Sequence, residues 1–168
     1  MIAALALVLA GALPDGLQTA VERVAAHDFP GAWAAANAET DAQKRAEARV
    51  YVRHHSGDLE GALLEAEAAS AAYAGDAWLA ERALYIALSL GRVHSAERAL
   101  PRLESALNAT GTPNRDSLVA ALERARPEVA ALVANAQARE ALDRRAHTVV
   151  FGIGAAATLL LVWLARRA

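Results

Sequence analysis

Two stretches of the chain, residues 46–62 with the sequence AEARVYVRHHSGDLEGA and residues 80–96 with the sequence AERALYIALSLGRVHSA, align without a gap. In this alignment the identical pairs are Ala46/Ala80, Glu47/Glu81, Tyr51/Tyr85, Gly57/Gly91 and Ala62/Ala96. The two stretches begin 34 residues apart, and an internal repeat with this period is typical of proteins built from stacked helical units.

Each copy of the repeat predicts two helices joined by a tight turn. Ala, Leu, Glu and Arg are abundant in both copies, and these residues favour helix. Gly57 and Gly91 suit the left-handed backbone position that follows the end of a helix. The small side chains of Ala62 and Ala96 allow the second helix to pack closely on the first. We therefore expect each copy to form an antiparallel helical hairpin.

The 34-residue period and the pattern Gly-x-apolar-x-x-Ala, at residues 57–62 and 91–96, resemble the tetratricopeptide repeat family. The chain departs from the family pattern in the first helix of each unit. The large residue and the Gly of the family are replaced by Ala46 and Val50, then by Ala80 and Leu84, and the closing Pro is absent. The resemblance implies an all-α solenoid of helical hairpins over residues 15–107. Another kind of helical bundle is the alternative.

Further helices are predicted on both sides of the two copies. Residues 27–32 (HDFPGA) show the same turn pattern in a shortened unit ahead of the first copy, between helices at 17–27 and 32–38. A helix over 95–107 follows the second copy, and residues 108–114 (NATGTPN) predict a loop. We expect residues 115–147 to form C-terminal helices, the first over 118–126 and the next beginning at Pro127.

The resemblance also implies where a partner binds, because the first helices of such repeats line the concave face. The family's groove positions correspond here to Lys44, Glu47, Tyr51 and His54 in one unit, and to Trp78, Glu81, Tyr85 and Leu88 in the next. Within each unit these positions lie on one face of a helix. Tyr51, Trp78 and Tyr85 are the strongest partner-binding candidates, because Tyr and Trp anchor many protein interfaces. The alternative is that the two tyrosines pack between repeats.

The C-terminal segment over residues 148–165 (TVVFGIGAAATLLLVWLA) contains no charged residue. As a helix it would span about 27 Å, close to the thickness of a bilayer core. Arg144 and Arg145 precede it, and Arg166 and Arg167 follow it. We therefore expect a transmembrane helix, with a buried core helix as the alternative.

Small residues recur inside this predicted span. Gly152 pairs with Ala156, and Gly154 with Thr158, each at a four-residue spacing. This spacing allows two helices to approach closely in a membrane. The pattern is compatible with a homo-oligomer formed through the transmembrane helix, and also with a helix that forms no dimer.

The N-terminal segment, residues 1–13, resembles a signal peptide. Residues 2–12 (IAALALVLAGA) are apolar, and residues 10–12 fit the small-x-small cleavage pattern. No Lys or Arg precedes the apolar run, so a first helix packed on the body and a misplaced start are alternatives. A cleaved signal places the body outside the cytoplasm, whereas a tail-anchored chain exposes it to the cytoplasm.

Several functional classes have no support in the sequence. The chain has no Cys, which excludes disulfides and thiolate chemistry. Residues 1–142 hold 13 basic and 18 acidic side chains, a net charge of −5, so no nucleic-acid partner is expected. His54 and His55 point about 100° apart on a helix, so no metal site is expected. No nucleophile elbow or phosphate-binding loop occurs, so we expect neither catalysis nor a cofactor.

The sequence therefore predicts a membrane-anchored module that binds a protein partner or scaffolds a complex at the membrane. The alternative is a structural subunit of a larger membrane assembly, held through its transmembrane helix.

Overall fold

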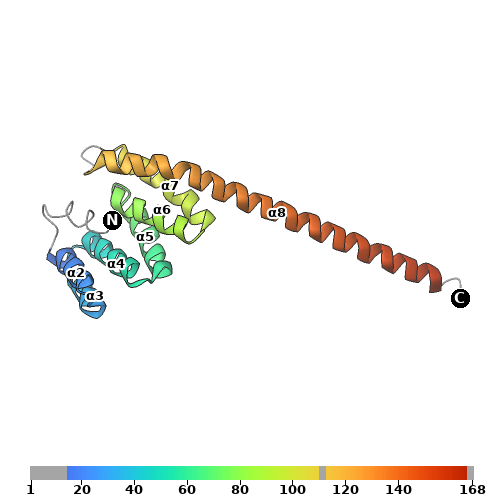
Figure 1. Cartoon of the computed structure of the whole chain (residues 1–168), viewed down its shortest axis with the longest axis horizontal. Coiled ribbons are helices and arrows are strands. Elements are labelled where there is room, and N and C mark those ends of the chain that lie inside the picture. The colour runs from blue at the N-terminus through green and yellow to red at the C-terminus, as the bar shows by residue number, and fades with distance from the viewer. Residues whose placement is uncertain (1–14, 110–112, 166–168) are drawn as a thin grey trace. The chain divides into compact units, whose positions relative to one another are not determined.

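The computed structural model is built from α-helices (Figure 1), and it describes residues 15–109 and 113–165, with residues 152–165 described by backbone alone. The described helices are α2 (Asp15–Ala25), α3 (Phe29–Ala38), α4 (Ala42–Ser56), α5 (Leu59–Ala72), α6 (Ala77–Ser89), α7 (Val93–Leu107) and α8 (Arg115–Ala165). No strand occurs in the part of the chain that the structure describes. The predicted all-α class is confirmed.

Three consecutive hairpins, α2–α3, α4–α5 and α6–α7, are closed by turns of the same geometry. His27, Gly57 and Gly91 adopt φ angles of 59°, 86° and 65°, in the left-handed region. In each turn the N–H of the next residue donates to a carbonyl five positions earlier. These bonds measure 2.8 Å from Asp28 to Arg23, 3.0 Å from Asp58 to Arg53 and 2.8 Å from Arg92 to Ala87. This is the Schellman arrangement, and the predicted role of the two glycines is confirmed.

Asp residues begin the second helix of the first two hairpins. Asp28 Oδ1 accepts a hydrogen bond from the N–H of Gly31 at 2.9 Å, and Asp58 Oδ1 accepts one from Gly61 at 3.0 Å. Each bond satisfies an N–H that the helix itself leaves without a partner. In the third hairpin Arg92 stands at this position and makes no capping bond with its side chain.

These turns correct three predicted helix ends. α2 ends at Ala25 rather than at His27, because His27 has a left-handed backbone. α3 begins at Phe29 rather than at Ala32, because Asp28 caps it there. α7 begins at Val93 rather than at Ser95, directly after the turn at Gly91.

The hairpins pack on one another through surfaces of small side chains. α4 contacts both α2 and α3 of the preceding hairpin, and α5 contacts both α6 and α7 of the following one. The alanines without exposed surface are Ala20, Ala32, Ala36, Ala48, Ala62, Ala66, Ala83, Ala87 and Ala96. Larger side chains that are fully buried include Leu79, Ile86 and Leu103. The core therefore depends on close approach between helices, as the Ala-rich composition predicts.

α8 begins against α7. Leu122, Ala125 and Val129 are buried, and Arg126 forms an ion pair with Glu104 of α7 at 3.0 Å. Helix α8 continues through Pro127, so the prediction that a new helix begins at Pro127 is wrong. Pro127 lies on the exposed side of the helix. We attribute the continuity to the buried residues on either side of it, whose packing offsets the lost backbone hydrogen bond.

Val129 is the last residue of this packed unit, and α8 continues into a second unit that begins at Ala130. The second unit exposes large apolar side chains at Leu142, Val149, Val150 and Phe151. Among the residues searched, none of the helices has the length and apolarity needed to cross a membrane.

Two parts of the sequence prediction lie outside the described residues. One is the signal-peptide-like segment, residues 1–13. The other is the predicted transmembrane span beyond Phe151, which is described by backbone alone, so the predicted packing of Gly152, Gly154, Ala156 and Thr158 lies outside what the structure describes.

Candidate functional site

The candidate site is the surface formed by the first helices of the second and third hairpins, α4 and α6. Asp41 caps α4 by accepting a hydrogen bond from the N–H of Lys44 at 3.0 Å. Asp76 caps α6 by accepting bonds from the N–H groups of Trp78 and Leu79, at 2.9 and 3.1 Å. These caps fix where each helix begins, and so fix which side chains lie on its outer face.

His54 of α4 and Tyr85 of α6 meet on this surface. Their ring centroids lie 5.9 Å apart with an interplanar angle of 66°, an edge-to-face contact. Tyr85 keeps 51% of its surface exposed, which makes it one of the most exposed large apolar side chains of the hairpins. Of the predicted partner-binding residues, Tyr85 is therefore the one best placed to contact another molecule.

Tyr51 has a different environment. It is partly buried against the core cluster of the first hairpin and α4, which includes Leu17, Val24 and Val52. Burial also raises the pKa of the Tyr51 hydroxyl, against the opposing charge of Arg82. Packing between hairpins, the alternative interpretation of the two tyrosines, thus describes Tyr51 well and Tyr85 poorly.

Arg82 supplies the positive charge of this surface, and the sequence analysis did not select it. Its guanidinium lies 5.4 Å from the ring centroid of Trp78 and pairs with Glu81 at 3.4 Å. The predicted residues Trp78 and Glu81 therefore surround Arg82. Both are partly buried, so they hold the guanidinium in place more than they offer a surface of their own.

The two neighbouring histidines are affected by the same charge. Burial, then the charges of His55 and Arg82, lowers the pKa of His54 to about 4. Partial burial and Arg82 also lower the pKa of His55. The ring of His55 lies 4.2 Å from that of Tyr51. At neutral pH the His54 imidazole is therefore uncharged.

Glu47 lies at the other end of the α4–α6 surface. Gln43 Nε2 donates a hydrogen bond to Asp76 Oδ2 at 2.9 Å and so joins the second and third hairpins. Burial, then the nearby Asp76 carboxyl, raises the pKa of Glu47 to about 7.

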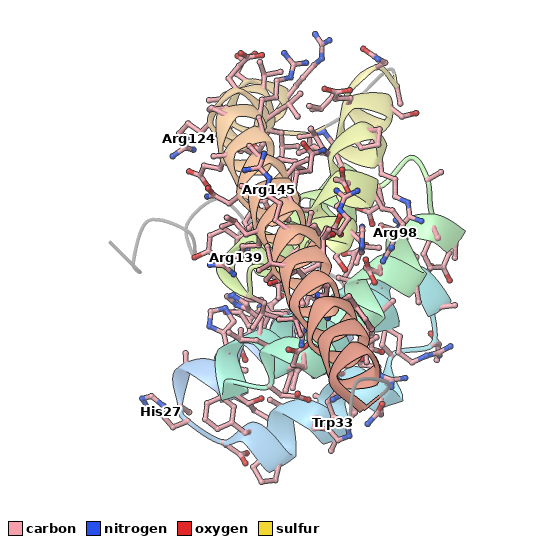
Figure 2. The ribbon with its side chains drawn as sticks, turned by 90° about the vertical axis from the view of Figure 1, so that its right-hand side faces the viewer. His27, Trp33, Arg98, Arg124, Arg139 and Arg145 are labelled. Atoms are coloured by element: carbon pink, nitrogen blue, oxygen red, sulfur yellow. The ribbon has the colours of Figure 1, made fainter. Side chains whose placement is uncertain are left out.

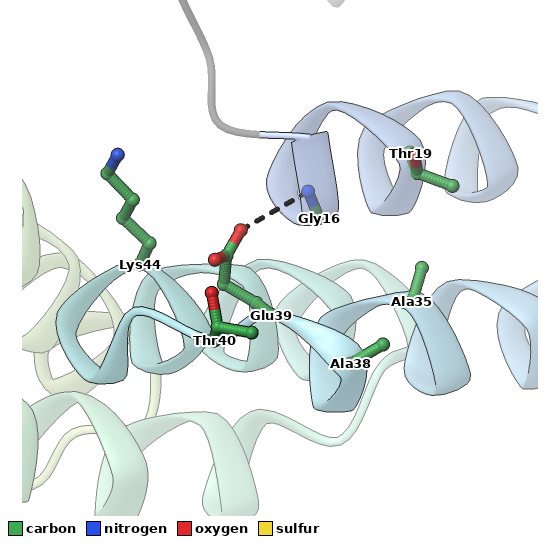
Figure 3. Close-up of a pocket in the computed structure, with 7 residues that line it drawn as sticks. All are labelled: Gly16, Thr19, Ala35, Ala38, Glu39, Thr40 and Lys44. Atoms are coloured by element: carbon green, nitrogen blue, oxygen red, sulfur yellow. Dashed lines mark hydrogen bonds between the residues drawn. The ribbon is translucent and has the colours of Figure 1, made fainter.

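Lys44 belongs to a separate hollow. This hollow is open, has a volume of about 650 Å³, and lies between the start of α2, the end of α3 and the start of α4 (Figure 3). The N–H of Gly16 donates to Glu39 Oε2 across it at 3.2 Å. Lys44 extends from α4 at its rim, with Thr40 beside Glu39. The structure therefore does not bring Lys44 together with His54 and Tyr85.

A second group that the sequence analysis missed connects the first and second hairpins. Trp33 of α3, labelled in Figure 2, lies under two guanidinium groups of α4, at 5.1 Å from Arg49 and 4.8 Å from Arg53. Both arginines pair with Glu65 of α5, at 2.7 and 3.0 Å. All the charges in this group are paired, so we assign it to packing.

Within the residues searched, no three His, Asp or Glu side chains come together as metal ligands would. His54 and His55 have ring centroids 5.1 Å apart, and their contacts are with the two tyrosines described above.

Comparisons of the chain with protein-family models, with curated proteins and with solved structures found no match.

Proposed function

We propose that the chain is a membrane-anchored protein-binding module built on hairpin repeats of the tetratricopeptide type. The observation that carries this proposal is Tyr85. A Tyr with 51% of its surface exposed, in edge-to-face contact with His54 and three residues after Arg82 on the same helix, has the features of an interface anchor. Tyr85 lies on α6, the first helix of its hairpin. First helices line the concave face in repeats of this kind.

The repeat interpretation is supported by the three turns. His27, Gly57 and Gly91 occupy the same left-handed position in three successive hairpins. Five residues after each of them stands an alanine with no exposed surface, Ala32, Ala62 or Ala96. A turn and a buried small residue at constant separation are what a repeated hairpin requires.

Anchoring is proposed from the C-terminal part of α8. Val149, Val150 and Phe151 are 58%, 68% and 74% exposed on a helix that continues to Ala165. Burying three consecutive apolar side chains in lipid would stabilise them by several kcal/mol, at about 1.5–3 kcal/mol each. The uncharged sequence that follows them supports a membrane span over residues 148–165.

Photocrosslinking tests the binding function. A photoreactive phenylalanine analogue would replace Tyr85 in the full-length chain, which is then illuminated in membranes of the source cell. We expect a specific protein adduct that disappears in the additional variant Arg82→Gln. Leu64 is the matched control, because it is 69% exposed but belongs to α5, a second helix of its hairpin. Equal adducts from positions 85 and 64 would argue against the proposal.

The same preparation tests the alternative, a structural subunit held through its span. Replacing Gly152 and Gly154 by Leu would disrupt an assembly that depends on close helix packing in the membrane. On our proposal this double variant keeps the Tyr85 adduct. Loss of the adduct in the double variant, with Arg82→Gln without effect, would favour the structural subunit.

The side of the membrane that holds the body is a separate question. We propose the exported side, on the signal-peptide pattern of residues 1–13. A reporter active only outside the cytoplasm, fused after Asn114, should be active. A cytoplasmic fluorescent reporter at the same site should be dark, and the reverse result would place the body in the cytoplasm.

A further inference from the structure

A second open hollow, of about 450 Å³, lies along α7 and is called here the α7 hollow. Its wall on one side is Ala74, from the turn after α5. The other lining residues belong to α7 and are Glu97, Arg98, Pro101, Arg102 and Ser105. Because α5 and α7 are the second helices of their hairpins, this hollow is separate from the α4–α6 surface. Its volume lies in the range of pockets that hold small ligands.

Arg98, Arg102 and Ser105 place hydrogen-bond donors along one face of α7. They are four and three residues apart, so they follow one another on successive turns of the helix. The side chain of Arg98, labelled in Figure 2, is 54% exposed. A guanidinium carries five N–H groups in a planar fork, which matches the oxygens of an oxyanion. The α7 hollow is therefore lined by two such forks and a hydroxyl.

Helix α5 holds both guanidinium groups in place. Arg98 Nη2 donates to Glu67 Oε1 at 2.8 Å and to Ser95 Oγ at 3.4 Å. Arg102 Nη1 donates to the carbonyl oxygen of Glu67 at 3.2 Å and to Ser70 Oγ at 3.3 Å. Ser70 is only 2% exposed, so its hydroxyl is a buried anchor for Arg102. Each arginine is thus fixed through one terminal nitrogen, and a ligand of the remaining N–H groups would order little that is not already ordered.

The charges around the α7 hollow leave Arg102 without a counter-ion. Glu67 pairs with Arg98 at 2.8 Å, and Glu97 pairs with His94 at 3.3 Å. Among the described residues, no carboxylate pairs with Arg102. Both acceptors of its hydrogen bonds are neutral oxygens. An anion in the hollow would supply the partner that this guanidinium lacks.

We propose that the α7 hollow binds a phosphate monoester, with Arg98 and Arg102 as cationic donors and the Ser105 hydroxyl as a third donor. A phosphate monoester has three terminal oxygens and can accept from all three side chains, whereas a carboxylate has two oxygens. The headgroup of a membrane lipid and a small soluble molecule can both carry this group. The proposal is independent of the protein partner proposed for the α4–α6 surface.

Nuclear magnetic resonance of the arginine Nε–H groups, in the full-length chain held in phosphatidylcholine nanodiscs, tests the site. Glycerol 3-phosphate is the probe, and sodium chloride keeps the ionic strength constant. We expect the signals of Arg98 and Arg102, assigned from Arg98→Lys and Arg102→Lys, to shift and to saturate. Arg92 is the control, because it is 55% exposed on the same helix cap but pairs with Glu60. Equal shifts at Arg92, or equal shifts with acetate in place of glycerol 3-phosphate, would overturn the proposal.

Two variants test the donors by the same titration. Arg102→Gln should raise the dissociation constant of glycerol 3-phosphate by about tenfold or more, since it removes a charged donor. Arg102 also bonds to Glu67 and Ser70, so Ser105→Ala provides a variant that leaves those contacts intact. It should raise the dissociation constant about threefold. Arg92→Gln should leave it unchanged. An unchanged value in Ser105→Ala, or in Arg102→Gln with the helical circular dichroism of the wild type, would overturn the assignment.

Nanodiscs that contain phosphatidic acid, whose headgroup is a phosphate monoester, distinguish the two sources. If the lipid is the ligand, the signals of Arg98 and Arg102 shift in these discs without added glycerol 3-phosphate, and Ser105→Ala reduces the shift. If the ligand is soluble, they shift only when glycerol 3-phosphate is added. The absence of a shift in both arms would overturn the proposal.

Discussion

Replacing Gly57 by Ala tests the turn that closes the second hairpin. Gly57 has φ 86°, and a Cβ atom added there would meet no other atom within 4 Å. The cost of the substitution is therefore conformational and not steric. An Ala in the left-handed region costs about 1–2 kcal/mol, and the loss of Gly from the unfolded chain returns about 0.4–1 kcal/mol. The free energy of unfolding should fall by about 1 kcal/mol.

Urea unfolding of the full-length chain in detergent micelles, followed by circular dichroism, measures this change. Gly75→Ala is the matched control, because its Cβ also meets nothing within 4 Å but its φ lies outside the left-handed range. We expect Gly75→Ala to change the free energy of unfolding by less than about 0.5 kcal/mol. The difference between the two variants then isolates the backbone strain.

The third hairpin extends the test. Gly91 has φ 65° and equally open space around its Cβ, so Gly91→Ala should cost about the same. The two turns belong to different hairpins, so their effects should add and the double variant should lose about 2 kcal/mol. If Gly57→Ala and Gly75→Ala unfold at the same urea concentration, residue 57 does not need a left-handed backbone and our account of the hairpin turn is wrong.

Three further variants test the core and the carboxyl group of Glu47 by the same unfolding experiment. Leu79 has no exposed surface, so Leu79→Ala should cost about 2–5 kcal/mol, whereas Leu64→Ala, at a side chain 69% exposed, should cost less than about 0.5 kcal/mol. Similar values for the two would contradict the assigned core. Ala62→Leu should cost at least about 1–3 kcal/mol, because Ala62 is fully buried between packed helices; a neutral result would mean that the helices do not approach closely there. Glu47→Gln should raise the free energy of unfolding by about 1 kcal/mol at pH 8 and leave it unchanged at pH 4. The reason is that the raised pKa of Glu47 reflects an environment that destabilises only the ionised carboxylate. An equal effect at pH 4 and pH 8 would show that the gain is not electrostatic.

The sequence predicted the turns because their determinants are local. A left-handed position and a small residue five places later can be recognised without knowing where the rest of the chain lies. A further local signal is the pattern Arg-x4-Asp-x2-Gly-Ala, which occurs at residues 23–32 and again at 53–62. In both copies the Arg pairs with the Asp that caps the second helix. That pattern would have placed the start of α3 at Phe29.

The composition of the candidate surface could not be predicted in the same way. Arg82 and Asp76 belong to α6 and its cap, and their effects on His54 and Glu47 of α4 depend on how two helices that are distant in the sequence pack together. A helical face drawn from sequence spacing places Lys44 beside Glu47. The structure assigns one to the hollow at α2 and the other to the contact with α6. Spacing along one helix carries no information about the neighbouring helix.

A comparison of the three hairpins indicates which of their features the fold requires. The cap is not constant, because Asp28 and Asp58 are replaced by Arg92, which forms an ion pair with Glu60 of the preceding hairpin instead. The left-handed residue is constant in geometry but not in identity, since His27 adopts the conformation of the two glycines. What remains the same in residue type, position and burial is the alanine five places later, with no exposed surface in any hairpin. A cap stabilises a single helix end by about 1 kcal/mol and can be exchanged for another contact, whereas a larger side chain at the alanine would separate two helices along their length. The separation of the helices, more than the capping of their ends, is therefore the property that the three hairpins share.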